Sequence, residues 1–276
     1  MKKVTYLLFF ICLNANASQW LTSFEDAQKL AIATNKNILI DFWATWCGPC
    51  KRMDSDSWSK SEVKELMNNY IPLKIDIDLY REISDKYDVK AIPYVFIVDP
   101  NGKVVFKNLS YMNKAKIMTV LNKYSYNTKY FQDDFLNFYK SKNGDLALKI
   151  AQKYFDYSIY VKEEVQSDYL KVANDYLKEA SKFYKKEGNK KKNAQRIGLL
   201  EDVYDNILRG NNEKANDIIE KKYAEEKINS DNKSFYVYLR LAIYEKQNDK
   251  ENAKVWYDKM KLMEGYRTEY LKIRKI

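Results

Sequence analysis

The chain has 276 residues, with 48 Lys and Arg against 38 Asp and Glu, so its formal net charge is +10. Lysines are mixed with acids along the C-terminal half, as in Lys162-Glu163-Glu164. This mixing indicates a solvated lysine-rich surface rather than a nucleic-acid-binding one. Seven Gly and four Pro beside 24 Tyr exclude a disordered protein. The length predicts more than one folded unit.

Residues 1–17 have the pattern of a secretory signal peptide. Its basic start, apolar stretch and small-residue cleavage site are Lys2 and Lys3, Val4–Leu13, and Ala15-Asn16-Ala17. The apolar stretch is too short to span a bilayer, and no other run approaches that length. We therefore expect a soluble protein with no stable membrane insertion, in the periplasm or another extracytoplasmic compartment. Export also argues against nucleic acid as a partner.

The three cysteines divide into one near the N-terminus and one close pair. Cys12 is the lipidated residue in an alternative lipoprotein reading, but Ile11 before it is bulkier than that processing favours. Cleavage after Ala17 removes Cys12 and leaves only Cys47 and Cys50. An exported protein with a single cysteine pair is not a disulfide-stapled scaffold.

The pair lies in the motif Trp46-Cys47-Gly48-Pro49-Cys50. An apolar run before the motif, Asn37–Ala44, predicts a buried strand, and the polar stretch after it, Lys51–Asp54, has helical character. At such a turn the first cysteine occupies a helix N-terminus, where free N–H groups and the helix dipole stabilise a thiolate. The second cysteine lies one turn further, close enough to form a disulfide. This arrangement predicts disulfide exchange.

Two other kinds of site contain paired cysteines. A structural zinc site needs four ligands, and the chain has no His and only Cys12 besides the pair, so we expect no metal. A purely structural disulfide is the second alternative. So short a loop constrains the unfolded chain little, which makes it an uncommon structural crosslink.

The sequence around the motif resembles thioredoxin, because Ile38–Lys51 follows the active-site strand of that family almost residue for residue. Two further segments match the family: Lys74–Asp78 resembles a strand, and Tyr87–Pro93 resembles the loop that carries its cis-proline. A strand pair follows, Tyr94–Val98 and Val104–Lys107, joined by a turn that contains Asn101-Gly102. The resemblance implies an α/β thioredoxin fold, a central mixed sheet flanked by helices, for residues 18–124.

The chain departs from the family pattern at two places. Met53–Trp58 lacks the proline that kinks the thioredoxin helix after the motif. A glycine that the family places near the substrate groove is replaced around Leu109-Ser110. The second departure puts in question whether the groove accepts the usual range of protein substrates.

The resemblance also implies different chemical roles for the two cysteines and for a nearby acid. Cys47 attacks a substrate disulfide, and Cys50 then resolves the mixed disulfide by forming the Cys47–Cys50 disulfide. Asp41, with the ammonium of Lys74 beside it, accepts the proton of Cys50. In the alternative reading Asp41 is only a buried acid paired with Lys74. Burying an acid within an apolar strand costs several kcal/mol, which favours a functional reason for it.

The substrate-binding residues implied by the resemblance surround the cysteines. They are Trp46, Gly48, Pro49, Ile92 and Pro93. In this family Gly-Pro between the cysteines goes with reducing proteins, so a reductase or isomerase that needs no cofactor is expected. Its partners are protein substrates with disulfides, and a membrane thiol transporter as the electron donor.

Residues 125–276 are predicted to form an all-α helical-hairpin domain. Aromatic and aliphatic residues recur at helical spacing, as in Phe131, Phe135, Phe138 and Tyr139. Breaks are expected at Asn143-Gly144, Gly188-Asn189, Gly210–Asn212 and Asn248-Asp249. The stripes predict packed cores more than ligand grooves.

Small alanines after three of these breaks are similar to the tetratricopeptide pattern. Ala147 and Ala215 are 68 residues apart, twice the 34-residue period, but Ala253 follows after 38. The sequence leaves a true tetratricopeptide array open. We expect this half to bind or orient a partner polypeptide, or to restrict access to the redox site. A binding or assembly protein with an accessory redox domain, and a dithiol redox sensor, are the alternative functions.

Overall fold

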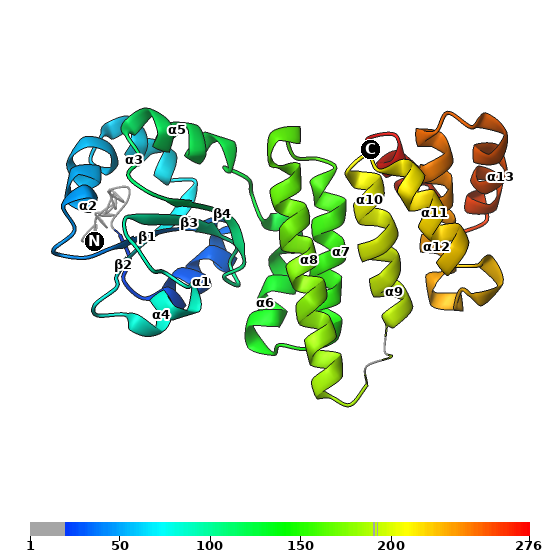
Figure 1. Ribbon diagram of the computed structural model, residues 1–276, viewed down its shortest axis with the longest axis horizontal. Coiled ribbons are helices and arrows are strands. Elements are labelled where there is room, and N and C mark those ends of the chain that lie inside the picture. Colours follow the sequence, from blue (N-terminus) through cyan, green and yellow to red (C-terminus); the bar gives the residue numbers. More distant parts are fainter. Residues whose placement is uncertain (1–19, 190, 192) are drawn as a thin grey trace, which may run out of the picture.

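The structure, a computed structural model, describes residues 20–189, 191 and 193–276 (Figure 1). The expected signal peptide and Cys12 lie outside these residues. Within the described part, a sheet with helices on both faces is followed by helices alone. The predicted fold class is thereby confirmed. Among the described helices, none combines the length and apolar character needed to cross a membrane.

The sheet has four strands in the order β2-β1-β3-β4. They are β1 (Asn37–Trp43), β2 (Tyr70–Asp76), β3 (Tyr94–Val98) and β4 (Val104–Leu109). Strand β1 is parallel to β2 and antiparallel to β3, which is antiparallel to β4. β2 begins before the expected Lys74 because its pairing with β1 already starts at Asn37 and Tyr70. That register places Lys74 directly opposite Asp41.

Alternate residues of β1 face opposite sides of the sheet, as its pleat requires. Ile38, Ile40 and Phe42 pack in one core with α1 (Phe24–Thr34), on the side where α4 (Arg81–Lys86) also lies. Leu39 packs in the other core, and Asp41 shares its face. This second face is covered by α2 (Gly48–Met53), a π-helical continuation η1 (Asp54–Trp58), α3 (Ser61–Met67) and α5 (Lys114–Lys123). Asp41 is therefore an acid buried among apolar side chains below the motif helix.

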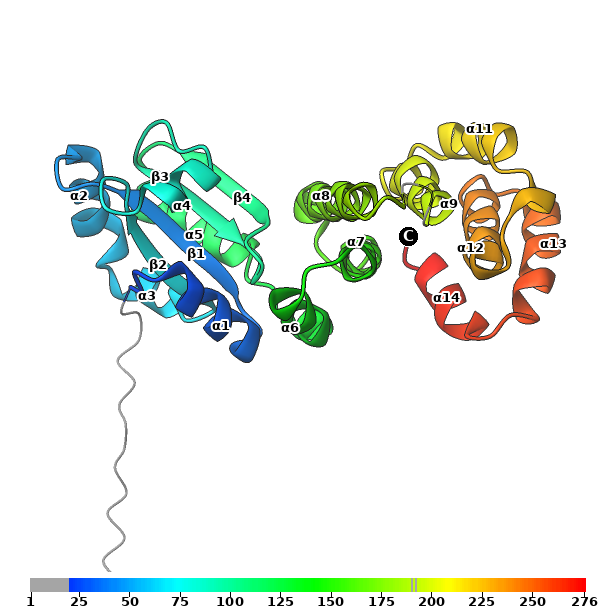
Figure 2. The same cartoon turned by 90° about the horizontal axis from the view of Figure 1, so that it is seen from below.

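The second half of the chain consists of helices that lead away from the sheet, except that the last one turns back toward the earlier helices (Figure 2). They are η2 (Lys129–Phe131), α6 (Gln132–Lys140), α7 (Gly144–Ser158), α8 (Glu163–Lys186), α9 (Ala194–Gly198), η3 (Leu199–Tyr204), α10 (Asp205–Leu208), α11 (Asn212–Lys222), η4 (Glu225–Lys227), α12 (Ser230–Lys246), α13 (Lys250–Lys261) and α14 (Tyr266–Ile273). Helix α7 begins at the expected break, where the Asn143 side chain accepts the N–H of Leu146. Ala147 and Ala215 are fully buried, as close helix packing requires.

The helical half packs against the end of the sheet that lies away from the motif (Figures 1 and 2). Buried in this contact is Asp99, in the turn after β3, which accepts hydrogen bonds from Tyr154 on α7 and Tyr176 on α8. Lys103 in the same turn forms an ion pair with Glu179 of α8. The motif helix α2 is at the opposite end, so these helices do not cover the redox motif. The expectation that they restrict access to it therefore finds no support in the packing.

Candidate active site

The cysteine pair occupies the turn from β1 into α2. Cys47 is the N-cap of α2, and its Sγ accepts the backbone N–H of Cys50 at 3.2 Å. Pro49 costs no hydrogen bond, since N–H groups in a first helical turn have no partner within the helix. The two residues form a disulfide, with their Cα atoms 5.3 Å apart. The cap hydrogen bond distinguishes the two sulfurs, because an N–H aimed at Cys47 favours its thiolate.

Exposure does not distinguish the cysteines in this disulfide form, since both are only 2% exposed. The residues around them are open to solvent: Gly48 and Pro49 are exposed, and Trp46 is 65% exposed. The Trp46 indole N–H donates to the Asp78 carboxylate at 2.8 Å, which fixes the ring beside the motif.

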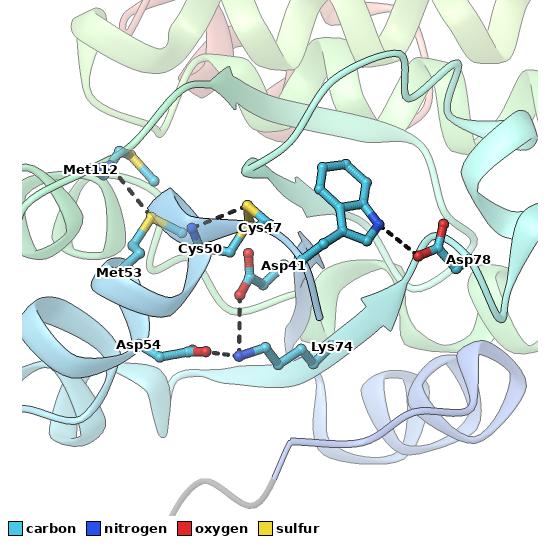
Figure 3. Close-up of a disulfide and its surroundings, with 9 residues drawn as sticks. Asp41, Cys47, Cys50, Met53, Asp54, Lys74, Asp78 and Met112 are labelled. Atoms are coloured by element: carbon cyan, nitrogen blue, oxygen red, sulfur yellow. Dashed lines mark hydrogen bonds and ion pairs between the residues drawn. A yellow bond between two sulfur atoms is a disulfide. The ribbon is translucent and has the colours of Figure 1, made fainter. Parts of the chain in front are cut away.

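Asp41 lies beneath the disulfide, 1% exposed (Figure 3). Its Oδ2 is 3.7 Å from Lys74 Nζ, and its Oδ1 has no hydrogen-bond partner among the described residues. Burial raises the pKa of Asp41 to about 7, and the Lys74 ammonium opposes that rise. A carboxyl group with this pKa can both accept and donate a proton near neutral pH.

Asp54 is a part of the site that the sequence reasoning missed. It opens η1, one helical turn after Cys50, and its carboxylate binds the Lys74 ammonium (Figure 3). Lys74 thus faces two carboxylates, and it also lies 4.8 Å from the centre of the Trp43 ring. The available signal was the spacing: an acid four residues after the second cysteine lies on the same face of the helix.

The loop before β3 supplies the other side of the site. The Ile92–Pro93 peptide bond is cis. Ile92 packs with Trp43 and Ile77 against the two cysteines. The Pro93 carbonyl accepts the N–H of Ser110, whose φ of 137° lies in the region that favours glycine. Ser110 occupies the place where a family glycine was noted as missing, so the backbone keeps a conformation suited to glycine although the side chain differs.

Comparisons with known proteins agree with this architecture. A model of the thioredoxin-like domain matches residues 24–125. The chain is 32% identical over 90 residues to a thioredoxin of Mycoplasmoides gallisepticum, covering 33% of this chain and 86% of the relative. The chain belongs to the thioredoxin family. With its cysteine pair, it is a thiol-disulfide oxidoreductase of the thioredoxin type.

Other relatives and solved structures also match less than two fifths of this chain. Thioredoxin-1 of Drosophila melanogaster is 39% identical over 71 residues, which is 25% of this chain and 64% of the relative, just under two thirds. A poplar thioredoxin h structure is 27% identical and covers 36% of this chain and 85% of that chain, with a TM-score of 0.32. The structure of the oxidised C-terminal domain of Neisseria meningitidis DsbD is 20% identical. The match covers 38% of this chain and 97% of that chain, with a TM-score of 0.33. The region matched by the family model ends at residue 125, so residues 126–276 lie outside it.

Proposed function

We propose that this thioredoxin-family oxidoreductase reduces disulfides of other proteins outside the cytoplasm, with Cys47 as the attacking and Cys50 as the resolving cysteine. The observation that carries the proposal is the asymmetric cap: the N–H of Cys50 bonds the sulfur of Cys47 at the start of a helix. A thiolate is the nucleophile in disulfide exchange, so the sulfur with this hydrogen bond is the better attacker.

In the first step the Cys47 thiolate attacks one sulfur of the substrate disulfide. The other substrate sulfur leaves with the bonding electrons and takes a proton from water. In the second step the Cys50 thiol gives its proton to Asp41 and attacks the Cys47 sulfur. The second substrate sulfur leaves with the electrons of its bond to Cys47 and takes a proton from water, so the substrate is released as a dithiol. The protein is left with the Cys47–Cys50 disulfide. An external dithiol, which we assign to a membrane thiol transporter, returns two electrons and two protons.

The substrate approaches over the exposed rim of the motif in this proposal. Trp46, Gly48 and Pro49 offer exposed surface beside the sulfurs, and Ile92 contacts the cysteines from the other side. The helical half, which packs at the far end of the sheet, leaves this rim open. Its proposed part is to hold the client while the disulfide is reduced.

A mixed-disulfide trap tests the assignment of the cysteines. The full chain with Cys50→Ser should accumulate a covalent adduct with a disulfide-bonded protein such as insulin, through Cys47, seen as a mass increase that dithiothreitol removes. The matched variant Cys47→Ser should form far less adduct. Equal trapping by both variants would overturn the division of roles.

The direction of the reaction is tested by equilibrating the full chain with glutathione buffers. A reducing protein should have a potential near about −270 mV, as thioredoxin itself has. A value near the −120 mV that is typical of the oxidant DsbA, on the order of 150 mV higher, would overturn the reducing direction. Repeated turnover with insulin separates an enzyme from the alternatives, because a dithiol sensor or an assembly protein with an accessory redox domain would not turn over.

The compartment is tested on the exported protein. If residues 1–17 are a signal peptide, the mass of the mature protein corresponds to a chain that begins after Ala17. A mature chain that keeps Met1–Ala17 would overturn the extracytoplasmic assignment and leave the chemistry unaffected.

A further inference from the structure

The Lys74 ammonium lies between two carboxylates that come from different elements. Asp54 at the start of η1 binds it directly, whereas Asp41 Oδ2 in β1 is 3.7 Å away. Nitrogen–oxygen hydrogen bonds are about 2.7–3.2 Å long, so Lys74 is bonded to Asp54 and only faces Asp41. Figure 3 shows this order, with Lys74 reaching past Asp41 toward Asp54.

We propose that Asp54 is a positioning residue: by holding the Lys74 ammonium out of hydrogen-bond contact with Asp41, it keeps the Asp41 carboxyl able both to take and to return the proton of Cys50. This inference rests on the proton-accepting role given to Asp41 in the proposed function. The Asp54 carboxylate binds Lys74 and acts through it, and the hydrogen bond from Asp54 to the cysteine pair is made by its backbone N–H, which donates to the Cys50 carbonyl as the C-cap of α2.

The groups that face Asp41 can be named element by element. Lys74 comes from β2, Asp54 and the Trp58 indole from η1, and the cysteine pair from α2, while its partner on β3 is Val95, which does not titrate. The Trp58 N–H has no hydrogen-bond partner within bonding distance in the described part of the chain, although its proximity lowers the pKa of Asp41. Asp54 raises that pKa and Lys74 lowers it. Neutralising Asp54 therefore removes a raising contribution and frees the ammonium to approach Asp41, and both changes lower the pKa of Asp41.

Lys74 has little room to leave if Asp54 is neutralised. Its side chain is only 15% exposed, and its ammonium lies over the rings of Trp43 and Trp20, at 4.8 Å and 5.8 Å from their centres. Among the described residues, Asp41 is then the carboxylate left within 4 Å of the Lys74 ammonium. The ammonium should then bond Asp41, and the carboxylate so stabilised would hold a proton too weakly to return it when Cys50 leaves as a thiolate.

The test is a titration of Asp41 in the oxidised full chain, without substrate, by the carboxyl ¹³C signal. Asp54→Asn should lower the midpoint by about one pH unit or more, the size expected when an opposite charge comes within contact of a carboxylate. Asp54→Glu should restore most of the original midpoint. Asp56→Asn is the matched control, since Asp56 lies in the same helix and, among the described residues, its carboxylate accepts a hydrogen bond from the Ser55 hydroxyl and none from Lys74. It should leave the midpoint unchanged.

A kinetic measurement completes the test, and Asp54→Ser serves as a second variant if Asp54→Asn folds poorly. The pH profile for decay of the mixed disulfide should move to lower pH with the Asp41 midpoint, and the movement should vanish when Asp41→Asn is added. An unchanged midpoint in the Asp54 variants would overturn the inference. A midpoint that falls without any change in the decay profile would also overturn it, while leaving disulfide reduction by Cys47 and Cys50 intact.

Discussion

The two ends of the sheet each contain a buried aspartate, and the two are bonded very differently. At the helical end, Asp99 Oδ1 accepts the backbone N–H groups of Asn101 and Lys103, and Oδ2 accepts the hydroxyls of Tyr154 and Tyr176. At the redox end, Asp41 has an ammonium at 3.7 Å, and one of its oxygens has no partner among the described residues. Burial raises the pKa of both carboxyl groups.

This difference is the one expected between an acid that joins segments of the fold and an acid that transfers a proton, which is the role proposed for Asp41. A buried carboxylate with four donors has its charge distributed over hydrogen bonds and joins the segments that supply them. A buried carboxylate with an unbonded oxygen lowers the stability of the fold, but that oxygen is free to accept a proton. The same residue type therefore fixes the junction at one end of the sheet and is available for proton transfer at the other.

Asp41→Asn should have the larger effect, and it should stabilise the protein. The pKa of Asp41 is raised from an ordinary 3.8 to about 7, so the folded state binds this proton more tightly than the unfolded one. The stability that this group contributes is fully present below about pH 4 and is lost as the pH rises through about 7, a total of roughly 4 kcal/mol. Urea unfolding between pH 4 and pH 8 should show this loss in the native sequence and not in the variant.

The same substitution should slow resolution of the mixed disulfide, by about 10²-fold if Asp41 is the general base. The first attack by Cys47 should be affected less. A variant that loses stability and keeps both rates would make Asp41 a structural partner of Lys74 and remove the contrast with Asp99.

Asp99→Ala should destabilise the protein by about 3 kcal/mol, because it leaves two backbone N–H groups and two buried hydroxyls without their acceptor. Asp99→Asn is the matched variant. It can still accept the backbone N–H groups and donate to a tyrosine hydroxyl, so we expect a loss of about 1 kcal/mol. Urea unfolding at pH 7 measures both, and trapping by Cys47 should be unchanged. Wild-type stability of Asp99→Ala would show that the junction does not depend on this carboxylate.

Tyr176→Phe should have the smallest effect of the three. It removes a hydroxyl that donates to Asp99 at 2.7 Å, and the loss of one hydrogen bond to a buried acid costs about 1.5 kcal/mol. Tyr160→Phe is the control, because Tyr160 is half exposed and its loss should change the unfolding midpoint little. Equal effects of the two variants would argue that Asp99 is held by its backbone hydrogen bonds alone.

Much of the first half could be predicted from local signals. The apolar run of β1, the cysteine spacing and the Asn101-Gly102 turn are each complete within a few residues, and the expected sheet was found. Roles for Cys47, Cys50 and Asp41 remain predictions that the proposed variants address. The spacing places Asp54 on the same helix face as Cys50, but its partner Lys74 is 20 residues away on a strand, and only the packing of η1 beside β2 brings the two together.

The sequence by itself determined the elements: a strand, a cysteine turn and a helix on one side, and aromatic stripes at helical spacing on the other. Local propensity and periodicity are properties of neighbouring residues, and they can be read without a fold. The tertiary structure alone decided which end of the sheet the helices cover. Asp99 meets Tyr154 and Tyr176 across 55 and 77 residues of chain, and such contacts leave no periodic trace in the sequence. Because those helices occupy the far end of the sheet, they leave the exposed residues beside the cysteine pair uncovered.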